Sequence, residues 1–274
     1  MRIVQLLPHR ASQEQNALQE MAALRAAGYE VIPISAPYSG IKGVVWFEAL
    51  GWLKAIRTKP DIVSCRDLDT LGAGLKVKRA TSAKLVYDMH EVYSMMVEDD
   101  VPKRLLPLIE RRERKLLLDV DLAIASDKGR EQWLADQGYV FRPRIVVLNC
   151  RDPMVPYVPP PHMQSLCYTG TLHPSRFIRE MVEAMGSIDG TLTIAGPDTP
   201  GSLYGWLKEK FGCGPEGFYG DEKVMFIGAV SPKLALRVLQ ESDLSIQMAN
   251  PASRINVLGP YNRLFDAMAA GRPS

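Results

Sequence analysis

The feature that most constrains this chain is a regular alternation of short apolar runs with longer amphipathic segments. The apolar runs have the length of strands, and in the first half of the chain we expect strands at 2–7, 30–34, 62–65, 84–88, 122–126 and 145–148. Between the first two, apolar residues recur at helical spacing over 13–27 and end at Gly28, as in a crossover helix. This order predicts an α/β fold with parallel sheets.

A proline-rich stretch divides the chain into two α/β series. Prolines lack the backbone donor that a strand ladder needs, so we interpret 153–163 as a linker between a domain at 1–152 and a domain at 164–274. In the second domain we expect strands at 166–169, 191–195, 224–227 and 244–247, alternating with helices at 176–185, 203–211 and 232–241. Two Rossmann-like domains of this kind bind ligands at the carboxyl ends of their strands.

Composition excludes several classes of protein. Lys and Arg number 33 against 31 Asp and Glu, for a formal net charge of +2, so no overall field favours nucleic acid. No apolar run reaches the roughly 18 residues of a membrane-spanning helix, and no signal peptide is present, so we expect a cytoplasmic protein. The four cysteines are widely spaced and predict free thiols, with Cys150 and Cys167 in the core.

A short helix with defined ends closes the sequence. Pro260 stands at its entry, Gly271 suits the left-handed residue past its end, and Pro273 prevents its continuation. Its first free amides, near 261–263, and the helix dipole favour an anion.

The polar face of this helix carries Asn262 and Asp266 four residues apart, while Leu264, Phe265 and Met268 are expected to pack inward. A carboxylate one turn beyond an anion-binding end can accept hydrogen bonds from ribose hydroxyls. The helix is therefore predicted to bind a nucleotide.

Five segments in sequence order resemble glycosyltransferase family 4: 60–71, 84–91, 146–150, 168–176 and 259–273. They include the strand-end sequence Asp88-Met89-His90-Glu91. The resemblance extends over nearly the whole chain and implies the two-domain GT-B fold, with sugar transfer from a nucleotide diphosphate donor and retention at the anomeric carbon. It implies no metal and no other cofactor. A domain of this family would begin another strand after residue 273, so we expect the second domain to be incomplete at its C-terminus.

The resemblance also implies roles for single residues. His90 corresponds to a histidine near the transferred sugar, with a structural histidine as the alternative, and Arg176 neutralises charge on the leaving phosphate together with Arg263. On the acceptor side we place Glu91, which can equally cap the next segment, and His9 and Arg10 of the first turn. The residues expected to bind the donor are Gly170, Thr171, Arg176, Gly196, Asn262, Arg263 and Asp266.

Two departures from the family pattern keep other functions open. Thr171 stands where members often carry an arginine, and Leu258 stands eight residues before Asp266, where members carry a carboxylate. The alternatives are an inactive or regulatory module that binds nucleotide sugars, and a nucleotide-sugar epimerase or hydrolase on the same fold.

Two further segments bear on metal binding and on dinucleotide binding, and the sequence favours neither. Asp67-Leu68-Asp69 has the spacing of a metal-binding pair, but it follows a strand of the first domain, where cleft-facing or capping roles are expected. The first turn, 8–12, lacks the Gly-x-Gly-x-x-Gly of dinucleotide enzymes, which disfavours a dehydrogenase.

The acceptor remains open between a saccharide, a lipid-linked molecule and a small molecule. Segments 44–57 and 103–115 mix bulky apolar and basic residues, as an interfacial helix on the inner face of a membrane would. The alternative is that the aromatic stripe is core and the basic run a solvated face.

Overall fold

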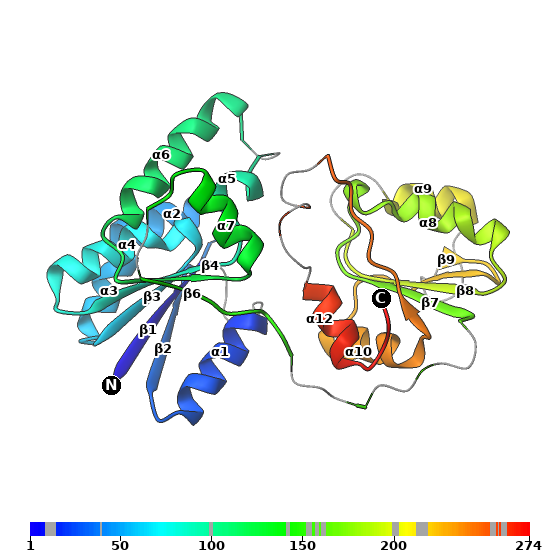
Figure 1. Cartoon of the computed structure of the whole chain (residues 1–274), viewed down its shortest axis with the longest axis horizontal. Helices are drawn as coiled ribbons and strands as arrows, with labels where there is room; N and C mark the ends of the chain where they lie inside the picture. The colour runs from blue at the N-terminus through cyan, green and yellow to red at the C-terminus, as the bar shows by residue number, and fades with distance from the viewer. Residues whose placement is uncertain are drawn as a thin grey trace. The chain divides into compact units, whose positions relative to one another are not determined.

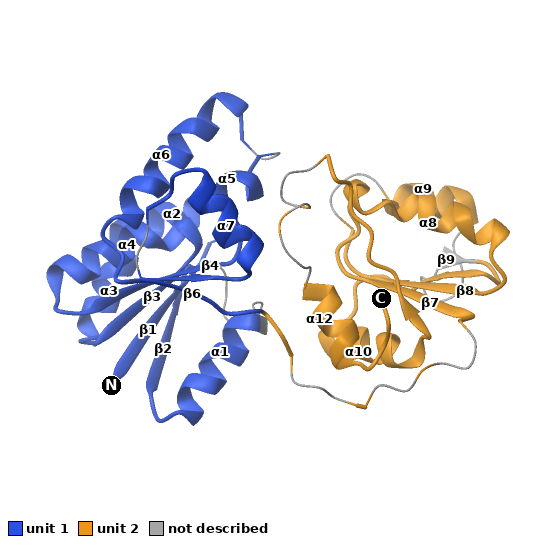
Figure 2. Ribbon diagram, viewed as in Figure 1, with its two compact units in different colours: residues 1–148 blue, residues 149–274 orange. Residues whose placement is uncertain are grey.

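The structure is a computed structural model that describes residues 1–8, 15–38, 40–98, 101–140, 143–151, 155–156, 159, 163–198, 203–211, 219–252, 256, 258 and 262–274. The chain divides into two compact units, Met1–Leu148 and Asn149–Ser274 (Figure 2). None of the helices in the described ranges is long and apolar enough to cross a membrane.

Unit 1 is a parallel sheet of six strands in the order β2-β1-β3-β4-β5-β6 (Figure 1). Its strands are β1 (Arg2–Leu7), β2 (Glu30–Ser35), β3 (Ile62–Arg66), β4 (Lys84–Met89), β5 (Leu122–Ala125) and β6 (Arg144–Val146). Its helices are α1 (Gln15–Ala26), α2 (Ile41–Trp46), the π-helix η2 (Phe47–Gly51), α3 (Trp52–Arg57), α4 (Asp67–Ala80), α5 (Tyr93–Met96), the 3-10 helix η3 (Lys103–Leu105), α6 (Leu106–Leu117) and α7 (Lys128–Asp136).

Helices cover both faces of this sheet, as the parallel arrangement requires. On one face α1 packs Ala17 and Met21 against Leu7 and Val31 of the sheet. On the other face α4 lies against β3 and β4 and contacts α6 (Figure 1). The carboxyl ends of all six strands therefore meet at one edge, where the connections to the helices begin.

Unit 2 contains a five-stranded sheet in the order β11-β7-β8-β10-β9. Its strands are β7 (Ser165–Thr169), β8 (Thr191–Ala195), β9 (Tyr219–Gly220), β10 (Val224–Phe226) and β11 (Leu244–Ser245). Its helices are the 3-10 helix η4 (Pro174–Arg176), α8 (Ile178–Ala184), the 3-10 helix η5 (Met185–Ser187), α9 (Leu203–Phe211), α10 (Pro232–Glu241) and α12 (Asn262–Ala269). The α/β class and the two Rossmann-like domains predicted from the sequence are confirmed.

Alternation along β7 sends its side chains to two separate cores. Leu166 and Tyr168 pack with the residues of α8 and α9, whereas Cys167 packs with Leu239 of α10 and Ala267 of α12. The two layers of helices thus hold the strand ends of unit 2 from opposite sides.

Several local expectations are wrong. Edge strand β9 pairs antiparallel with β10, so the second sheet is not purely parallel. The helix expected at 176–185 is interrupted at Phe177, whose left-handed φ of 54° separates η4 from α8. Cys65 and Cys167 are buried free thiols, but Cys150 is exposed because it follows β6 and lies outside both cores.

Helix α12 ends where the sequence predicts, but the residues on its buried face are not the predicted ones. Gly271 has a φ of 66°, and its amide donates to the Met268 carbonyl, so it ends α12 as expected. Met268, however, is 62% exposed, while Ala267 and Ala270 are buried against α10 and β7. Small residues face inward because the helix approaches its neighbours closely. Pro260 and residue 261 lie outside the described residues.

Candidate functional site

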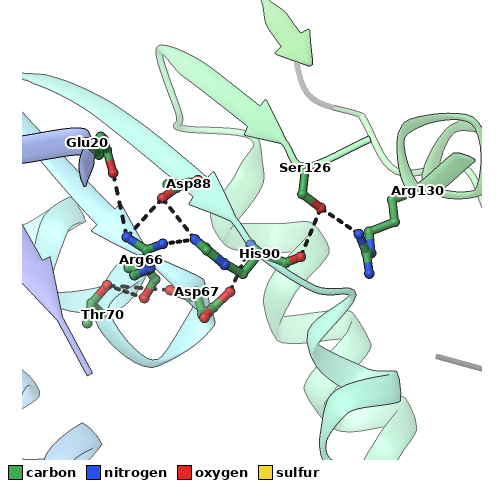
Figure 3. A network of polar contacts seen from close by, with 8 residues as sticks. All are labelled: Glu20, Arg66, Asp67, Thr70, Asp88, His90, Ser126 and Arg130. Carbon is green, nitrogen blue, oxygen red and sulfur yellow. Dashed lines mark hydrogen bonds and ion pairs between the residues drawn. The ribbon is translucent and has the colours of Figure 1, made fainter. Parts of the chain in front are cut away.

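Charged side chains gather in unit 1 where three neighbouring strands end (Figure 3). Arg66 is the last residue of β3, His90 follows β4, and Ser126 follows β5. These strands are adjacent and parallel, so their carboxyl ends share one edge of the sheet. The Arg66 guanidinium is buried there, with 6% of its side chain exposed, and a buried charge needs partners.

Arg66 joins three side chains. Its Nη1 lies 3.6 Å from Glu20 Oε2 and 3.6 Å from Asp88 Oδ2, and its Nη2 contacts His90 Nε2 (Figure 3). Because a guanidinium only donates, Nε2 of His90 accepts and Nδ1 carries the proton. Burial, followed by the charges of Arg66 and Arg130, lowers the pKa of His90 to about 3. The imidazole is therefore neutral near neutral pH and can donate from Nδ1.

Backbone contacts fix the loop that carries His90. Its amide donates to Asp67 Oδ1 over 3.1 Å, and its carbonyl accepts from Ser126 Oγ over 2.9 Å. Asp67 itself has a left-handed φ of 54°, a strained conformation for a residue with a side chain. Burial raises the pKa of Asp67 well above its ordinary value. The strand end after β4 is thus tied to the ends of β3 and β5.

Glu91, expected on the acceptor side, pairs with a buried arginine. Arg130 Nη2 lies 2.6 Å from Glu91 Oε2, its backbone amide donates to Asp127 Oδ1 over 2.8 Å, and its Nη1 donates to Ser126 Oγ over 2.8 Å. Glu91 thus neutralises a guanidinium that is only 8% exposed, as a residue with a structural role would. His9 and Arg10 lie outside the described residues.

Sequence reasoning missed Arg66 and Arg130. Their only signal is position: Arg66 ends a strand next to the acidic motif, and Arg130 stands one turn after Asp127. In that motif Asp67 accepts from the His90 amide and Asp69 accepts from the Tyr93 hydroxyl. Across the described ranges, no group of three or more His, Cys, Asp or Glu side chains is arranged to hold a metal ion.

In unit 2, a glycine follows each of three adjacent strands. Gly170 follows β7, Gly196 follows β8, and Gly228 lies just beyond β10, with φ values of 140°, 157° and 73°. The Gly170 amide donates to the Ala195 carbonyl over 2.9 Å, and the Gly196 amide donates to the Gly228 carbonyl over 2.8 Å. A Cβ on Gly196 would lie 1.8 Å from the Gly170 carbonyl oxygen. Only glycine permits this close approach of the two strand ends.

Arg263 of α12 lies over this strand end. Its Cζ is 4.9 Å from the centre of the Tyr168 ring, its Nη1 contacts the Tyr168 hydroxyl, and that hydroxyl donates to the Thr171 carbonyl over 2.8 Å. A Cβ on Gly170 would lie 2.7 Å from Arg263 Cδ. Burial raises the pKa of Tyr168, while the positive charges of Arg263 and Arg176 act against this rise. The structure thus places both predicted cations near one phenol.

The Asp266 carboxylate forms an ion pair with Arg151. Nε of Arg151 donates to its Oδ1, and the two side chains are 18% and 21% exposed. Burial raises the pKa of Asp266, although Arg151 lowers it. Arg151 follows the first unit directly in sequence and was missed, because nothing in the sequence relates it to a helix more than a hundred residues away. Asn262 is exposed at the first turn of α12.

Two Rossmann-like units, each with polar groups at its strand ends, define the GT-B fold class, and solved structures agree. No protein-family model and no curated protein matches the chain. Sucrose-phosphate synthase from Thermosynechococcus elongatus superposes with a TM-score of 0.69 and 15% identity, covering 100% of this chain and 80% of that one. HepE from Anabaena in complex with UDP superposes with a TM-score of 0.67 and 15% identity, covering 100% of this chain and 79% of that one. A putative UDP-N-acetylglucosamine 2-epimerase from Listeria monocytogenes superposes with a TM-score of 0.59 and 13% identity, covering 89% of this chain and 73% of that one. At these identities the likeness establishes the fold.

Proposed function

We propose that this chain is a glycosyltransferase of the family 4 type that transfers a sugar from a nucleoside diphosphate sugar with retention of configuration. The observation that carries the proposal is the position of Arg263 over the Tyr168 ring at the end of β7, beside Gly170, where the positive charge of Arg176 also acts on the phenol. In the order β11-β7-β8, the chain adds β8 on one side of β7 and later adds β11 on the other side, so the topological switch point, where such sheets bind ligands, lies beside β7. The GT-B fold of structures solved with UDP supports the same site.

The roles within the site follow from charge and hydrogen-bonding capacity. Arg176 and Arg263 neutralise the charge that develops on the leaving diphosphate, assisted by the first turn of α12 at Asn262. Gly170 and Gly196 let the phosphates approach the backbone, and Thr171 offers its hydroxyl. Asp266 accepts from the ribose hydroxyls once Arg151 has released it. No metal is needed in this scheme, because the arginines supply the positive charge.

Unit 1 contributes His90 and the acceptor side. His90 donates from Nδ1 to a hydroxyl of the transferred sugar, since its Nε2 is held by Arg66 and its low pKa keeps the imidazole neutral near neutral pH. We place the acceptor, a saccharide, a lipid-linked molecule or a small molecule, next to Glu91, His9 and Arg10, in the cytoplasm.

The test is isothermal titration of the chain with UDP, GDP, UDP-glucose and GDP-mannose. We expect one nucleotide family to bind, and Asp266→Ala to weaken its binding by about tenfold, the contribution of about one charged hydrogen bond. Glu241→Ala is the matched control, because Glu241 is an exposed carboxylate on α10 with only a surface partner. Absence of binding to folded protein, or equal weakening in both variants, would contradict the proposal.

Arg151→Ala tests whether Arg151 competes with ribose for the Asp266 carboxylate. If Arg151 competes with ribose, its removal strengthens nucleotide binding by several fold, because the carboxylate no longer has to break an ion pair. Weaker binding would instead show that Arg151 contacts the phosphates. Nuclear magnetic resonance of the new glycoside shows whether the anomeric configuration of the donor sugar is retained in the product.

A second candidate is a nucleotide-sugar epimerase or hydrolase, favoured by the likeness to a putative UDP-N-acetylglucosamine 2-epimerase. This reaction needs the donor site and no acceptor. Incubation with nucleotide sugars alone separates the candidates: release of free sugar or of an epimer supports the second, and turnover only with added acceptor supports transfer. Binding without turnover under either condition indicates a non-catalytic module.

A further inference from the structure

Two helical segments of unit 1, away from the candidate site, expose aliphatic side chains. On α2 and η2, Ile41 is 82% exposed, Val45 62% and Leu50 52%; on α6, Leu108 is 61% exposed. Single exposed apolar residues are ordinary on protein surfaces, but four on two neighbouring elements call for a physical reason.

The aromatic residues of the same segment do not share this exposure. Phe47 is fully buried, Trp46 lies under the Lys54 ammonium at 5.1 Å, and Trp52 lies near the Lys76 ammonium at 5.9 Å. The aromatic stripe noted in the sequence is therefore partly core, and the side chains directed to solvent are aliphatic ones between lysines.

Side-chain contacts join the two segments. Glu48 of η2 accepts from Arg112 of α6 over 2.8 Å and pairs with Lys76 of α4 over 2.7 Å. These groups meet above Gly72 of α4, where a Cβ would lie 2.0 Å from Glu48 Oε1 and 3.3 Å from Arg112 Nη2. Because Gly72 has no side chain, the Glu48 and Arg112 side chains can meet over α4 and connect η2 with α6. We call the exposed residues of α2, η2, η3 and α6 the helical face.

The helical face is basic as well as aliphatic. Its exposed cations are Lys42, Lys103, Arg104, Arg111, Arg112 and Lys115. The acidic residues in these segments do not balance them at the surface: Glu48 is paired, Glu110 is partly buried, and Glu113 is fully buried. An occupant of this face must therefore carry negative charge and offer an apolar environment.

We propose that the helical face docks on the surface of a bilayer containing anionic lipids. Its aliphatic side chains stand singly among basic residues, so each can enter the acyl boundary without a matching pocket, which a protein partner would have to supply. Lysine and arginine stems reach the phosphates while their methylene groups stay in the interface. Each basic residue near an anionic surface adds attraction, and the exposed leucine, isoleucine and valine side chains add an apolar contribution.

Topology gives this docking a further consequence. The connection from β4 to the parallel strand β5 begins at the carboxyl end of β4, so His90, and after it Lys103 and Arg104, follow that edge of the sheet in the chain. A bilayer under the helical face would bring lipid-linked acceptors near that edge. This consequence rests on the proposed function, whereas the docking itself does not.

The experiment is cosedimentation of the full chain with two kinds of vesicle, phosphatidylcholine alone and equal parts of phosphatidylcholine and phosphatidylglycerol. We expect binding to the mixed vesicles only, and at least about a tenfold loss of binding in the double variant Arg111→Glu with Lys115→Glu. Lys233→Glu with Arg237→Glu on α10 makes the same change of charge elsewhere and should bind like the unaltered chain. Val45→Ser with Leu108→Ser should lose the part of the binding that resists salt.

Circular dichroism and nucleotide titration accompany each variant. All altered residues are exposed, so folding and nucleotide affinity should be unchanged, which separates this test from failure of the proposed function. The docking proposal is overturned if the unaltered chain does not bind mixed vesicles, or if the α10 variant loses binding as fully as the α6 variant does.

Discussion

At the scale of single residues, the contact between Arg66 and His90 decides which proton the imidazole carries. A donor held against Nε2 leaves Nδ1 as the free N–H, and the same positive charge opposes protonation. The histidine is therefore prepared to donate a hydrogen bond and not to exchange a proton. Its neighbour Asp88, 3.6 Å from Nε2, balances the guanidinium.

The first prediction concerns this pair. Arg66→Gln should raise the pKa of His90 from about 3 toward its ordinary value, because one of the two cations that lower it is gone. Titration of the imidazole by nuclear magnetic resonance measures the change. Arg79→Gln, at an exposed arginine paired with Asp119 on the surface, should leave the pKa unchanged. An unshifted pKa in Arg66→Gln would show that burial and Arg130 set it without Arg66.

The second prediction concerns Glu113, a fully buried carboxyl that accepts from the Tyr87 hydroxyl over 3.0 Å and from the Tyr139 hydroxyl over 3.4 Å. Burial raises its pKa from 4.5 to about 7. The folded state then keeps a proton that the unfolded state releases between these values. The stability from this group is complete below pH 4.5 and is lost as the pH rises through about 7.

Glu113→Gln removes this dependence. The free energy of unfolding of the unaltered chain, relative to the variant, should fall by about 3 kcal/mol between about pH 5 and pH 8, at roughly 1.4 kcal/mol per pKa unit. Urea denaturation at several pH values measures it. Glu30→Gln, at an exposed carboxylate paired with Arg2, is the control and should show no such trend. A flat difference for Glu113→Gln would contradict the raised pKa.

At the scale of elements, α12 shows how packing selects a face that periodicity does not. Ala267 and Ala270 face α10 and β7, which brings Arg263 to the strand end at Gly170 and Asp266 to Arg151. Larger residues on the inner face would push the helix outward and move both side chains. Close packing of these small residues therefore sets where the side chains of the candidate site lie.

The third prediction tests this packing. Ala267→Leu should destabilise the chain by about 1–3 kcal/mol, because a fully packed helix contact cannot take a larger side chain without displacement. It should also weaken nucleotide binding. Met268→Leu, at a residue 62% exposed, is the control with little expected effect on either quantity. Thermal unfolding and titration measure both; tolerance of Ala267→Leu would mean that α12 is loosely held.

At the scale of the whole molecule, the two units have separate cores and separate candidate sites. The proposed nucleotide contacts all lie in Asn149–Ser274, while His90 and its network lie in Met1–Leu148. A ligand that lacks the sugar should therefore act mainly on one unit.

The fourth prediction follows from this division. UDP or GDP, whichever binds, should slow amide hydrogen exchange at 168–172 and 262–270 and leave exchange at β3, β4 and β5 nearly unchanged. Mass spectrometry of peptic fragments measures this difference. Protection of the β3–β5 strand ends by nucleotide alone would contradict the assignment of the donor site to the second unit.

The sequence determined the architecture because periodicity is local. Alternating apolar runs predict the strands of both units, and Gly271 with Pro273 predicts the end of α12, since turn chemistry depends on few neighbours. The sequence could not supply the partners of the site. Arg66 meets His90 and Arg151 meets Asp266 only because parallel pairing and helix packing bring distant segments together. Side-chain protonation and the inner face of α12 depend on those contacts, so tertiary structure alone decides them.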